Sequence, residues 1–351
     1  MYKSHTVGVV VPAYNEEPFI ESVLETIPDY VDRVYVVDDG STDDTWGAIH
    51  RALETVAETA SHHPSARTTT DGGAGRTALS TGPDTAFDRR IVPIRHAENR
   101  GVGGAIKTGY MHALEDGIDV TAVMGGDGQM DPEFLPRLLD PIVDGTVDYT
   151  KGNRLLHRTY REGMPPWRFF GNSILTFLTK IASGYWKMMD PQNGYTAISG
   201  QALQSIDLEG LYEYYGYCND LLVKLNASGM RVGDVAIPAQ YGEENSSIEY
   251  PTYIRKVSGM LLRNFAWRLK TRYLVLDFHP LALFYAFGSL IGLLGSLGVA
   301  WSIYAWQRLE TPLFIRFALS SLLFITGSLF LLFAMLFDMQ ANEDREVQLY
   351  D

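Results

Sequence analysis

Four short polar motifs stand directly after apolar runs, where strands are expected to end. The first contains Pro12, Tyr14 and Glu16, and the second contains the adjacent pair Asp38 and Asp39. Carboxylates accept hydrogen bonds from base N–H groups and ribose hydroxyls, so we expect Asp38 and Asp39 beside a nucleoside. Pro12 and Tyr14 are expected to shape the base pocket, and Glu16 to reach the ribose. The alternative for the aspartate pair is an acidic cluster favoured by the dipole of the helix that follows.

The third motif is rich in glycine and opens an expected helix. Gly101, Gly103 and Gly104 allow a close approach to the backbone at a helix N-terminus, which is a suitable site for a diphosphate. Lys107 lies one turn further along. Its ammonium would either add positive charge to this site or remain solvated, and the sequence favours neither.

The fourth motif places Asp127 in a glycine-rich turn, followed by Gln129. Mg²⁺ and Mn²⁺ prefer oxygen ligands, and one or two carboxylates can hold such an ion together with diphosphate oxygens and waters. We therefore expect Asp127 to bind Mg²⁺ or Mn²⁺, with Gln129 as a further ligand. Asp131 stands before Pro132, so it is equally suited to a ligand and to a helix N-cap.

The elements that must position these motifs alternate between strand and helix. Apolar runs predict strands at 7–11, 33–38, 91–94 and 120–124, and the segments between them predict helices at 17–27, 43–60 and 103–116. Such alternation argues for parallel βαβ units and an α/β fold. In open sheets of this class, ligands bind beyond the carboxyl ends of the strands. Residues 61–90 interrupt the pattern with many Ser, Thr, Gly and Asp residues, and we predict a flexible insertion there.

The C-terminal part of the chain has a different character. Pro280–Trp306 carries no charged residue, and Leu313–Phe337 carries only Arg316. A bilayer core of about 30 Å needs about 20 helical residues, so each run is predicted to span a membrane. The net charge of −13 disfavours nucleic acid as a partner, and the single cysteine, Cys218, excludes an intrachain disulfide.

A basic segment precedes the first apolar run. Six basic residues and no acidic residue lie between Ile254 and Arg272. The apolar residues of one helical face are Ile254, Val257, Leu261, Phe265 and Leu269. This pattern predicts a basic amphipathic helix on the membrane surface, and an ordinary surface helix is the alternative. The positive-inside rule then predicts a multi-pass protein of the cell membrane whose catalytic domain and both termini are cytoplasmic.

Four such motifs in this order, each after a strand, resemble the nucleotide-sugar glycosyltransferases of family 2, which have the GT-A fold. The resemblance covers roughly residues 5–245. The family usually shows Asp-x-Asp before Gly-Gln, whereas Gly125 replaces the first aspartate here. Lys151–Arg154, Trp167-Arg168 and Asp190–Tyr195 are similar to the polyprenyl-phosphate branch of the family, which includes the dolichyl-phosphate mannose and glucose synthases.

The resemblance implies transfer of one hexose from UDP-glucose or GDP-mannose to dolichyl or polyprenyl phosphate, with inversion. Arg154 and Arg168 are the candidates for binding the acceptor phosphate, because guanidinium groups fit phosphate bidentately. Asn172 would be a hydrogen-bond partner there. The alternative is that either arginine lies on the protein surface without binding the acceptor, or contacts lipid headgroups. Gln192 and Asn193 are expected near the sugar.

Asp220 resembles the acid that many family members present as a general base. A phosphate oxygen is already a competent nucleophile, so we expect Asp220 to orient a sugar hydroxyl or an arginine. The alternative enzyme adds a sugar to a hydroxyl of a lipid-linked glycan and needs Asp220 as base. A different class, a non-catalytic membrane scaffold, has support only from Gly125.

The predicted organisation is a GT-A domain (1–245), a basic juxtamembrane segment (246–275), two transmembrane helices (276–338) and a cytoplasmic tail (339–351). The expected partners are a nucleotide sugar, a polyprenyl or dolichyl phosphate and the bilayer. The spans would serve as an anchor, or shape the acceptor groove and the interface of a homo-oligomer. The aromatic stretch Trp167–Met189 is expected to be core or an interfacial helix. The sequence leaves the sugar, the nucleotide and the lipid length open.

Overall fold

The computed structural model describes residues 1–61, 90–155, 166–238, 250–309 and 312–349. The chain forms two compact units. The first contains Met1–Gly152, Asn193–Tyr217 and Ile237–Glu244. The second contains Asn153–Gln192, Cys218–Ala236 and Asn245–Asp351. Nearly all of the predicted insertion, 61–90, lies outside the described residues.

Six strands in the first unit form a mixed and mostly parallel arrangement in the order β3-β2-β1-β4-β6-β5. They are β1 (Val7–Ala13), β2 (Arg33–Asp38), β3 (Ile91–Arg95), β4 (Val120–Val123), β5 (Tyr149–Asn153) and β6 (Thr196–Ser199). β1 pairs in parallel with β2 and β4, and β2 with β3, whereas β6 is antiparallel to β4 and β5. The predicted α/β fold class with a mostly parallel sheet is confirmed.

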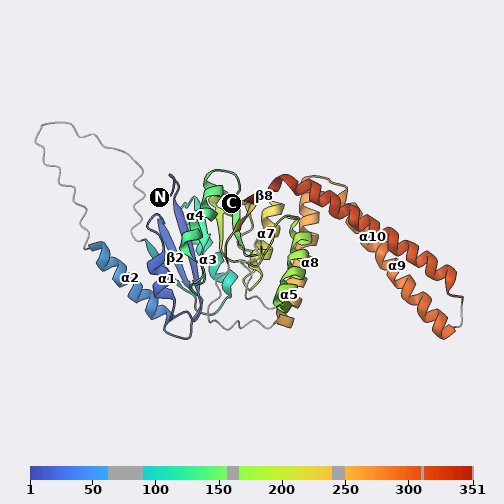
Figure 1. The fold of residues 1–351 in the computed structure, drawn as a ribbon, viewed down its shortest axis with the longest axis horizontal. Helices are drawn as coiled ribbons and strands as arrows, with labels where there is room; N and C mark the ends of the chain where they lie inside the picture. The colour runs from blue at the N-terminus through green and yellow to red at the C-terminus, as the bar shows by residue number, and fades with distance from the viewer. Residues whose placement is uncertain (62–89, 156–165, 239–249, 310–311, 350–351) are drawn as a thin grey trace, which may run out of the picture. The chain divides into compact units, whose positions relative to one another are not determined.

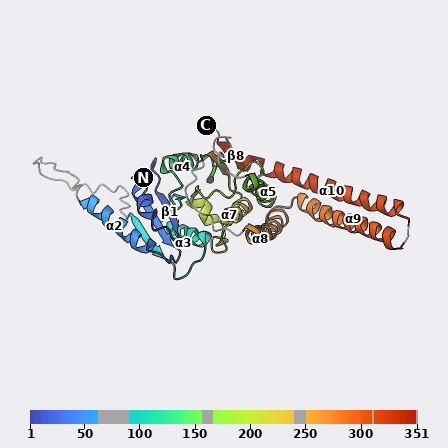
Figure 2. The ribbon, with the colours of Figure 1, turned by 60° about the horizontal axis from the view of Figure 1, so that its bottom comes forward.

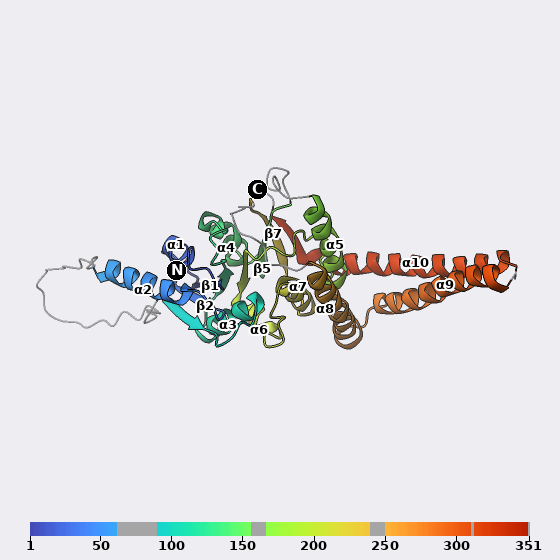
Figure 3. The same cartoon turned by 90° about the horizontal axis from the view of Figure 1, so that it is seen from below.

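The helices of the first unit cover both faces of these strands. They are α1 (Ile20–Thr26), α2 (Thr45–Ser61), α3 (Val102–Glu115), η1 (Pro132–Phe134), α4 (Leu135–Val143) and α6 (Gly200–Ser205). Figure 3 shows α1 and α4 on one face and α3 and α6 on the other. Buried on both faces, the central strand β1 is an almost continuous run of valines, as expected for a parallel strand between two helical layers.

The second unit contains the remaining elements. They are α5 (Pro166–Ser183), α7 (Tyr217–Ala227, whose first residue belongs to the first unit), β7 (Val232–Ala236), α8 (Tyr250–Lys270), the π-helical turn η3 (Thr271–Leu276), α9 (Leu281–Leu309), α10 (Phe314–Asn342), η4 (Glu343–Arg345) and β8 (Glu346–Leu349). β8 pairs in parallel with β7. The segment predicted as a cytoplasmic tail therefore continues α10 and then adds a strand.

Helices α9 and α10 are long and apolar enough to cross a membrane. They lie side by side as a hairpin (Figures 1 and 2). Their backbones approach closely where neither carries a side chain: a Cβ on Gly327 would lie 2.3 Å from the backbone nitrogen of Gly292. Small residues at such contacts are typical of helix pairs in membranes. The two predicted spans are therefore present as helices of sufficient length.

Helix α8 differs from its prediction because its apolar face packs against protein. Val257 and Leu261 are buried. Phe265 and Leu269 pack against a cluster formed by Tyr273, Leu281, Ala282, Tyr285 and Ala334. Ile254 is half exposed. The amphipathic pattern identified the face correctly, but neighbouring helices cover most of it. These residues therefore form no continuous exposed stripe that could contact lipid.

Two of the six bases expected on the membrane surface are also buried. Arg268 is fully buried, and its Nη1 and Nη2 donate to the Asp338 carboxylate at 3.0 and 2.8 Å. Tyr273 donates its hydroxyl to the same carboxylate at 3.0 Å, and Arg272 donates to the carbonyl oxygen of Asn226. The other four bases are exposed and form what we call the basic face of α8: Arg255, Lys256, Arg263 and Lys270.

The aromatic stretch 167–189 forms α5 and the loop that follows it. Leu175 and Ala182 are buried, whereas Ile174 and Phe177 are 46% and 51% exposed. α5 packs against α8. The helix therefore has one face in the core of the second unit, as the first alternative predicted, and another apolar face that is exposed.

Candidate active site

The strand register brings the first two motifs to one edge of the sheet. Ala13 lies opposite Asp38, and Asp38 lies opposite Arg95. The backbone of Gly126 donates to the carbonyl of Pro12 at 3.1 Å, which extends the β1–β4 pairing beyond the strands. The loops after β1, β2, β3 and β4 therefore meet at the carboxyl edge, as the parallel sheet predicts.

Asp38 is fully buried at this edge. Its Oδ1 accepts the backbone N–H of Ser41 at 2.9 Å, and its Oδ2 lies 3.1 Å from Nε of Arg95. The Arg95 guanidinium lies over the ring of Trp46, 5.4 Å from its centroid. Gly40, Ser41, Arg95, His96 and Ala97 line a cavity beside this group. Asp38 itself does not line this cavity, so the nucleoside contact stays a prediction.

Asp39 has a different set of partners, all within the protein. Its Oδ1 contacts Nδ1 of His96 at 2.6 Å and accepts the Arg100 backbone N–H at 2.9 Å, while Oδ2 accepts the Gly101 N–H at 2.7 Å. Nε2 of His96 in turn lies 2.9 Å from Oγ1 of Thr108. In this structure Asp39 fixes the start of the glycine-rich loop, a role that the sequence did not predict.

The loop after β1 is held by the loop after β2. The Ser41 hydroxyl accepts the backbone N–H of Asn15 at 3.0 Å, and the Thr45 hydroxyl accepts that of Glu16 at 2.8 Å. Asn15 has a φ of 58°, a left-handed conformation that Asn tolerates better than most residues. Tyr14 is 44% exposed beside it. Tyr14 and Glu16 thus stand at the predicted edge with a fixed backbone.

The glycine-rich loop is approached by protein backbone. A Cβ on Gly103 would lie 2.3 Å from the carbonyl oxygen of Tyr212, and the Gly104 N–H donates to the carbonyl of Glu213 at 2.9 Å. Lys107 donates to the Glu213 carboxylate at 2.9 Å. The sequence predicted a diphosphate at this helix N-terminus; in the structure the segment 212–217 covers it. Pairing with Lys107, and next with Arg100, holds the pKa of Glu213 below its ordinary value.

Asp127 lies in the turn after β4. Its Oδ1 accepts the backbone N–H of Gln129 at 3.0 Å. Burial raises the pKa of Asp127 above its ordinary value, although backbone hydrogen bonds oppose the shift. Asp131 accepts the N–H of Glu133 at 2.9 Å and caps η1, so the N-cap alternative describes its side chain here.

A divalent ion would find one carboxylate in this turn. Among the described residues, no group of three or more His, Cys, Asp or Glu side chains is arranged to hold a metal ion. Mg²⁺ commonly binds to one or two carboxylates together with substrate phosphates and waters. The residues present fit a metal site that a diphosphate completes, with Asp127 as the protein ligand and Gln129 beside it.

The candidates for the acceptor lie in the second unit. Arg154 donates Nε and Nη2 to the Asp190 carboxylate at 2.7 and 2.9 Å. Asp190 is almost completely buried, and Arg154 is a quarter exposed. The side chains of Arg168 and Asn172 lie outside the described part of the structure. Of the three residues predicted to bind the acceptor phosphate, Arg154 is therefore the one whose side-chain contacts the structure describes.

Asp220, on α7, is also buried in the second unit. Its Oδ1 accepts Nδ2 of Asn264, on α8. The neighbouring Asn219 donates to the Thr179 hydroxyl at 2.7 Å. These bonds join α7 to α8 and α5, so Asp220 has a packing role that its sequence motif did not reveal.

Gln192 and Asn193 stand at the predicted tight turn. Asn193 accepts the backbone N–H of Tyr195 at 3.0 Å. Nε2 of Gln192 is buried without a hydrogen-bond partner in the described residues. Buried amides are usually satisfied, and a sugar hydroxyl is a suitable acceptor for this group.

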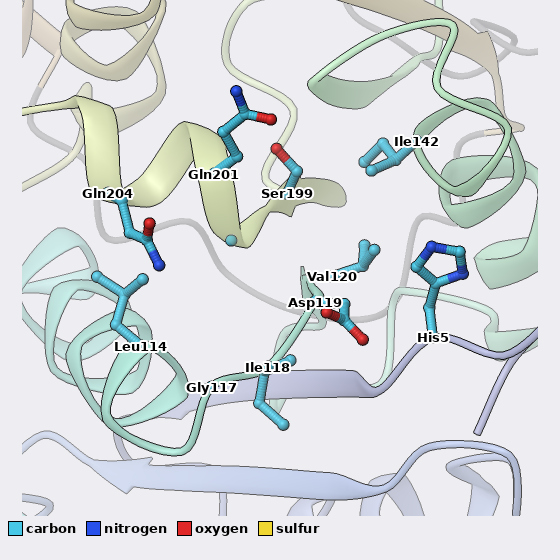
Figure 4. A pocket seen from close by; sticks show the side chains of 11 residues that line it. His5, Leu114, Gly117, Ile118, Asp119, Val120, Ile142, Ser199, Gln201 and Gln204 are labelled. Atoms are coloured by element: carbon cyan, nitrogen blue, oxygen red, sulfur yellow. The ribbon is translucent and has the colours of Figure 1, made fainter.

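A second hollow in the first unit lies elsewhere. It is lined by residues that include His5, Asp119, Ser199 and Gln201 (Figure 4). β1 and β4 begin here at Val7 and Val120, so the hollow is at the amino edge of the parallel strands. None of the predicted site residues lines it.

Comparisons with known proteins give the class. A family model described as "Glycosyl transferase family 2" matches residues 8–61 and 79–206. The match covers more than half of the chain, so the protein belongs to glycosyl transferase family 2 and is a glycosyltransferase.

Two relatives and one solved structure are similar to this chain. A UDP-N-acetylglucosamine–dolichyl-phosphate N-acetylglucosaminyltransferase of Methanococcus voltae is 28% identical over 67% of this chain and 86% of its own. An undecaprenyl-phosphate mannosyltransferase of Micrococcus luteus is 29% identical over 65% of this chain and 81% of its own. Glucosyl-3-phosphoglycerate synthase of Mycobacterium tuberculosis aligns with a TM-score of 0.47 and 20% identity, over 76% of this chain and 80% of that chain.

Proposed function

We propose that this glycosyltransferase transfers a single sugar from a nucleotide sugar to the phosphate of a polyprenyl or dolichyl lipid. The observation that carries the proposal is the likeness to two transferases of this type, each over about two thirds of the chain, in a protein that also carries two helices able to cross a membrane. A lipid acceptor requires the enzyme to work at a bilayer, and these helices provide the anchor.

The reaction needs no strong base. An oxygen of the lipid phosphate attacks the anomeric carbon, and the bond from that carbon to the nucleoside diphosphate breaks on the opposite face, which inverts the configuration. Most of the rate then comes from positioning the reactants and from stabilising the leaving group. Arg154 and Arg168 are proposed to hold the acceptor phosphate, with Asn172 beside them. Asp220 is proposed to orient a sugar hydroxyl or an arginine.

On the donor side, Asp38 and the loop of Pro12, Tyr14 and Glu16 are proposed to hold the nucleoside. Asp39 supports them by fixing the loop that begins at Arg100. Gln192 and Asn193 are proposed to contact the sugar. Mg²⁺ or Mn²⁺ bound at Asp127, with Gln129 as a further ligand, would neutralise charge on the diphosphate.

The donor sugar is the finer part of the proposal. Glucose and mannose were expected from the resemblance, and the Methanococcus voltae relative adds N-acetylglucosamine. Purified full-length protein in detergent is incubated with short polyprenyl phosphate, Mg²⁺ or Mn²⁺, and UDP-glucose, UDP-N-acetylglucosamine or GDP-mannose in turn. Mass spectrometry is expected to find a lipid phosphate carrying one sugar with one of the donors. Free lipid phosphate alone in every reaction would contradict the proposal.

We infer that the catalytic domain and both termini are cytoplasmic. The support is the basic face of α8, whose four bases precede the first apolar helix; such residues are enriched on the cytoplasmic side. A reporter fused after Asp351 should resist protease added outside intact cells. Its digestion in intact cells would contradict this orientation.

A further inference from the structure

The loop after α5 is held by two carboxylates from β8 and β7. The backbone N–H groups of Trp186 and Met188 donate to Glu346 at 2.7 and 3.0 Å, and that of Lys187 donates to the same carboxylate. The next N–H, of Met189, donates to Asp234 at 2.7 Å. Four consecutive peptide groups thus end on two side chains. Buried peptide N–H groups need hydrogen-bond acceptors, so the loop conformation depends on these acids.

Glu346 reaches this loop from the far end of the chain. It is the first residue of β8 and lies opposite Val232 in the parallel pairing with β7. Its side chain is 7% exposed. A buried carboxylate must be compensated by hydrogen bonds, and the three N–H groups of the loop supply them. The strand after the apolar hairpin is therefore joined to the loop by a side chain as well as to β7 by its backbone.

Asp190 follows directly after this anchored segment. Its φ of 47° is in the left-handed region, which a non-glycine residue keeps only where its surroundings hold it. In this conformation its carboxylate accepts Nε and Nη2 of Arg154, at 2.7 and 2.9 Å, and also the Arg154 backbone N–H at 3.2 Å. Asp190 therefore fixes both the backbone and the guanidinium of Arg154.

We propose that Glu346 is a positioning residue for the acceptor phosphate: it holds the loop 186–189 so that Asp190 presents Arg154 to the lipid phosphate. This rests on the proposed function, in which Arg154 binds that phosphate. The strand after the apolar hairpin then belongs to the acceptor-binding apparatus and does more than end the chain. Glu346 itself does not touch the substrate.

The test compares Glu346→Gln with Glu343→Gln in the full-length protein in detergent. Gln has nearly the same shape but turns an N–H donor toward the loop donors. Glu343 is a matched control on the same segment, because its carboxylate is 66% exposed and only approaches Lys187 at 3.6 Å. The KM for short polyprenyl phosphate should rise about tenfold in Glu346→Gln, the equivalent of one lost hydrogen bond. The KM for the nucleotide sugar should stay within about twofold, as should both constants of the control.

A double-mutant cycle tests whether Glu346 acts through Asp190. If it does, Glu346→Gln combined with Asp190→Asn should raise the acceptor KM by less than the product of the two single effects. Multiplicative effects would overturn the proposal. An unchanged acceptor KM in Glu346→Gln would also overturn it, as would equal rises of the acceptor and donor KM.

Two further results keep the proposal distinct from its premise. If Glu346→Gln is not recovered as folded protein, Glu346→Asp is measured in the same way, since it retains the charge but is one methylene shorter. A raised acceptor KM in that variant supports the proposal, and an unchanged KM overturns it. If wild-type protein makes no sugar-phosphate lipid with any donor, the proposed function fails. Wild-type transfer with unaltered variants refutes only the role of Glu346.

Discussion

The substitution Asp338→Asn tests the buried ion pair that joins α8 to the end of α10. Arg268 and Asp338 are both fully buried, and two hydrogen bonds of 3.0 and 2.8 Å link them. Burial alone would lower the pKa of Arg268, but the adjacent carboxylate more than offsets this and keeps the pKa above its ordinary value. An arginine guanidinium is effectively always protonated in proteins, so Arg268 stays charged when its partner is neutralised. Asparagine would leave a buried cation without a counter-charge.

The expected cost is large for a single substitution. Removing one partner of a buried ion pair costs about 3–5 kcal/mol. For a protein of this size, about 2–4 °C is lost per kcal/mol, so the midpoint of thermal unfolding should fall by about 6–20 °C. The measurement is thermal unfolding in detergent, followed by light scattering and intrinsic fluorescence.

The double variant Arg268→Met with Asp338→Leu is the matched control for charge. It removes both ions, so it should be less damaging than Asp338→Asn alone. A midpoint for Asp338→Asn within about 2 °C of wild type would refute this reasoning, because it would mean that water or another group compensates Arg268. A double variant worse than the single one would show that packing dominates over charge.

Three other substitutions are expected to have distinct effects. Asp127→Asn should reduce turnover by about 10²–10³-fold with an unchanged unfolding midpoint; normal turnover in steady-state assays would remove it from the site. Gly103→Ala should cost about 1–3 kcal/mol of stability, because its Cβ would lie 2.3 Å from the carbonyl oxygen of Tyr212; an unchanged thermal midpoint would show that the segment is not closely packed there. Burial raises the pKa of Glu346 from 4.5 to about 7, so its contribution to folding is fully present below pH 4.5 and is lost as the pH rises through about 7. Relative to Glu346→Gln, wild type should therefore lose about 3 kcal/mol across this window, and parallel melting profiles of the two proteins would contradict the shift.

The strands were predictable because their signal is local. β2 has the predicted bounds, Arg33–Asp38, and β1 extends the predicted run by two residues to Ala13. A central parallel strand is buried on both faces, so its apolar run is continuous and easily read. The carboxyl-edge position of Asp38 and Asp127 follows from the same alternation.

The partners of the polar side chains were not predictable because they are distant in the sequence. The ion pair of Arg154 joins it to Asp190, 36 residues away. Glu346 binds the backbone of Trp186, 160 residues away. A local sequence pattern predicts whether a side chain is exposed or buried. The partner of that side chain depends on which distant elements the fold brings together. Asp39 shows the same limit, since its motif did not reveal its contacts with His96, Arg100 and Gly101.

The periodicity of α8 had a similar limitation. It correctly grouped Val257 and Leu261 on one face. A periodic apolar face predicts only that the face is covered, and does not identify the element that covers it. The cover is a cluster that includes residues of η3, α9 and α10. The sequence predicts a surface position for Arg268 because its negative partner, Asp338, follows it by 70 residues.

The central claim is that the acceptor is a lipid phosphate. Its most direct test gives the enzyme two acceptors that differ only in that group, a short polyprenyl phosphate and the corresponding polyprenol, with the donor that the panel identifies. The account predicts a product carrying one sugar from the phosphate alone, with little loss in Asp220→Asn. Sugar transfer to the polyprenol hydroxyl, abolished by Asp220→Asn, would contradict it and establish a hydroxyl acceptor with Asp220 as its base.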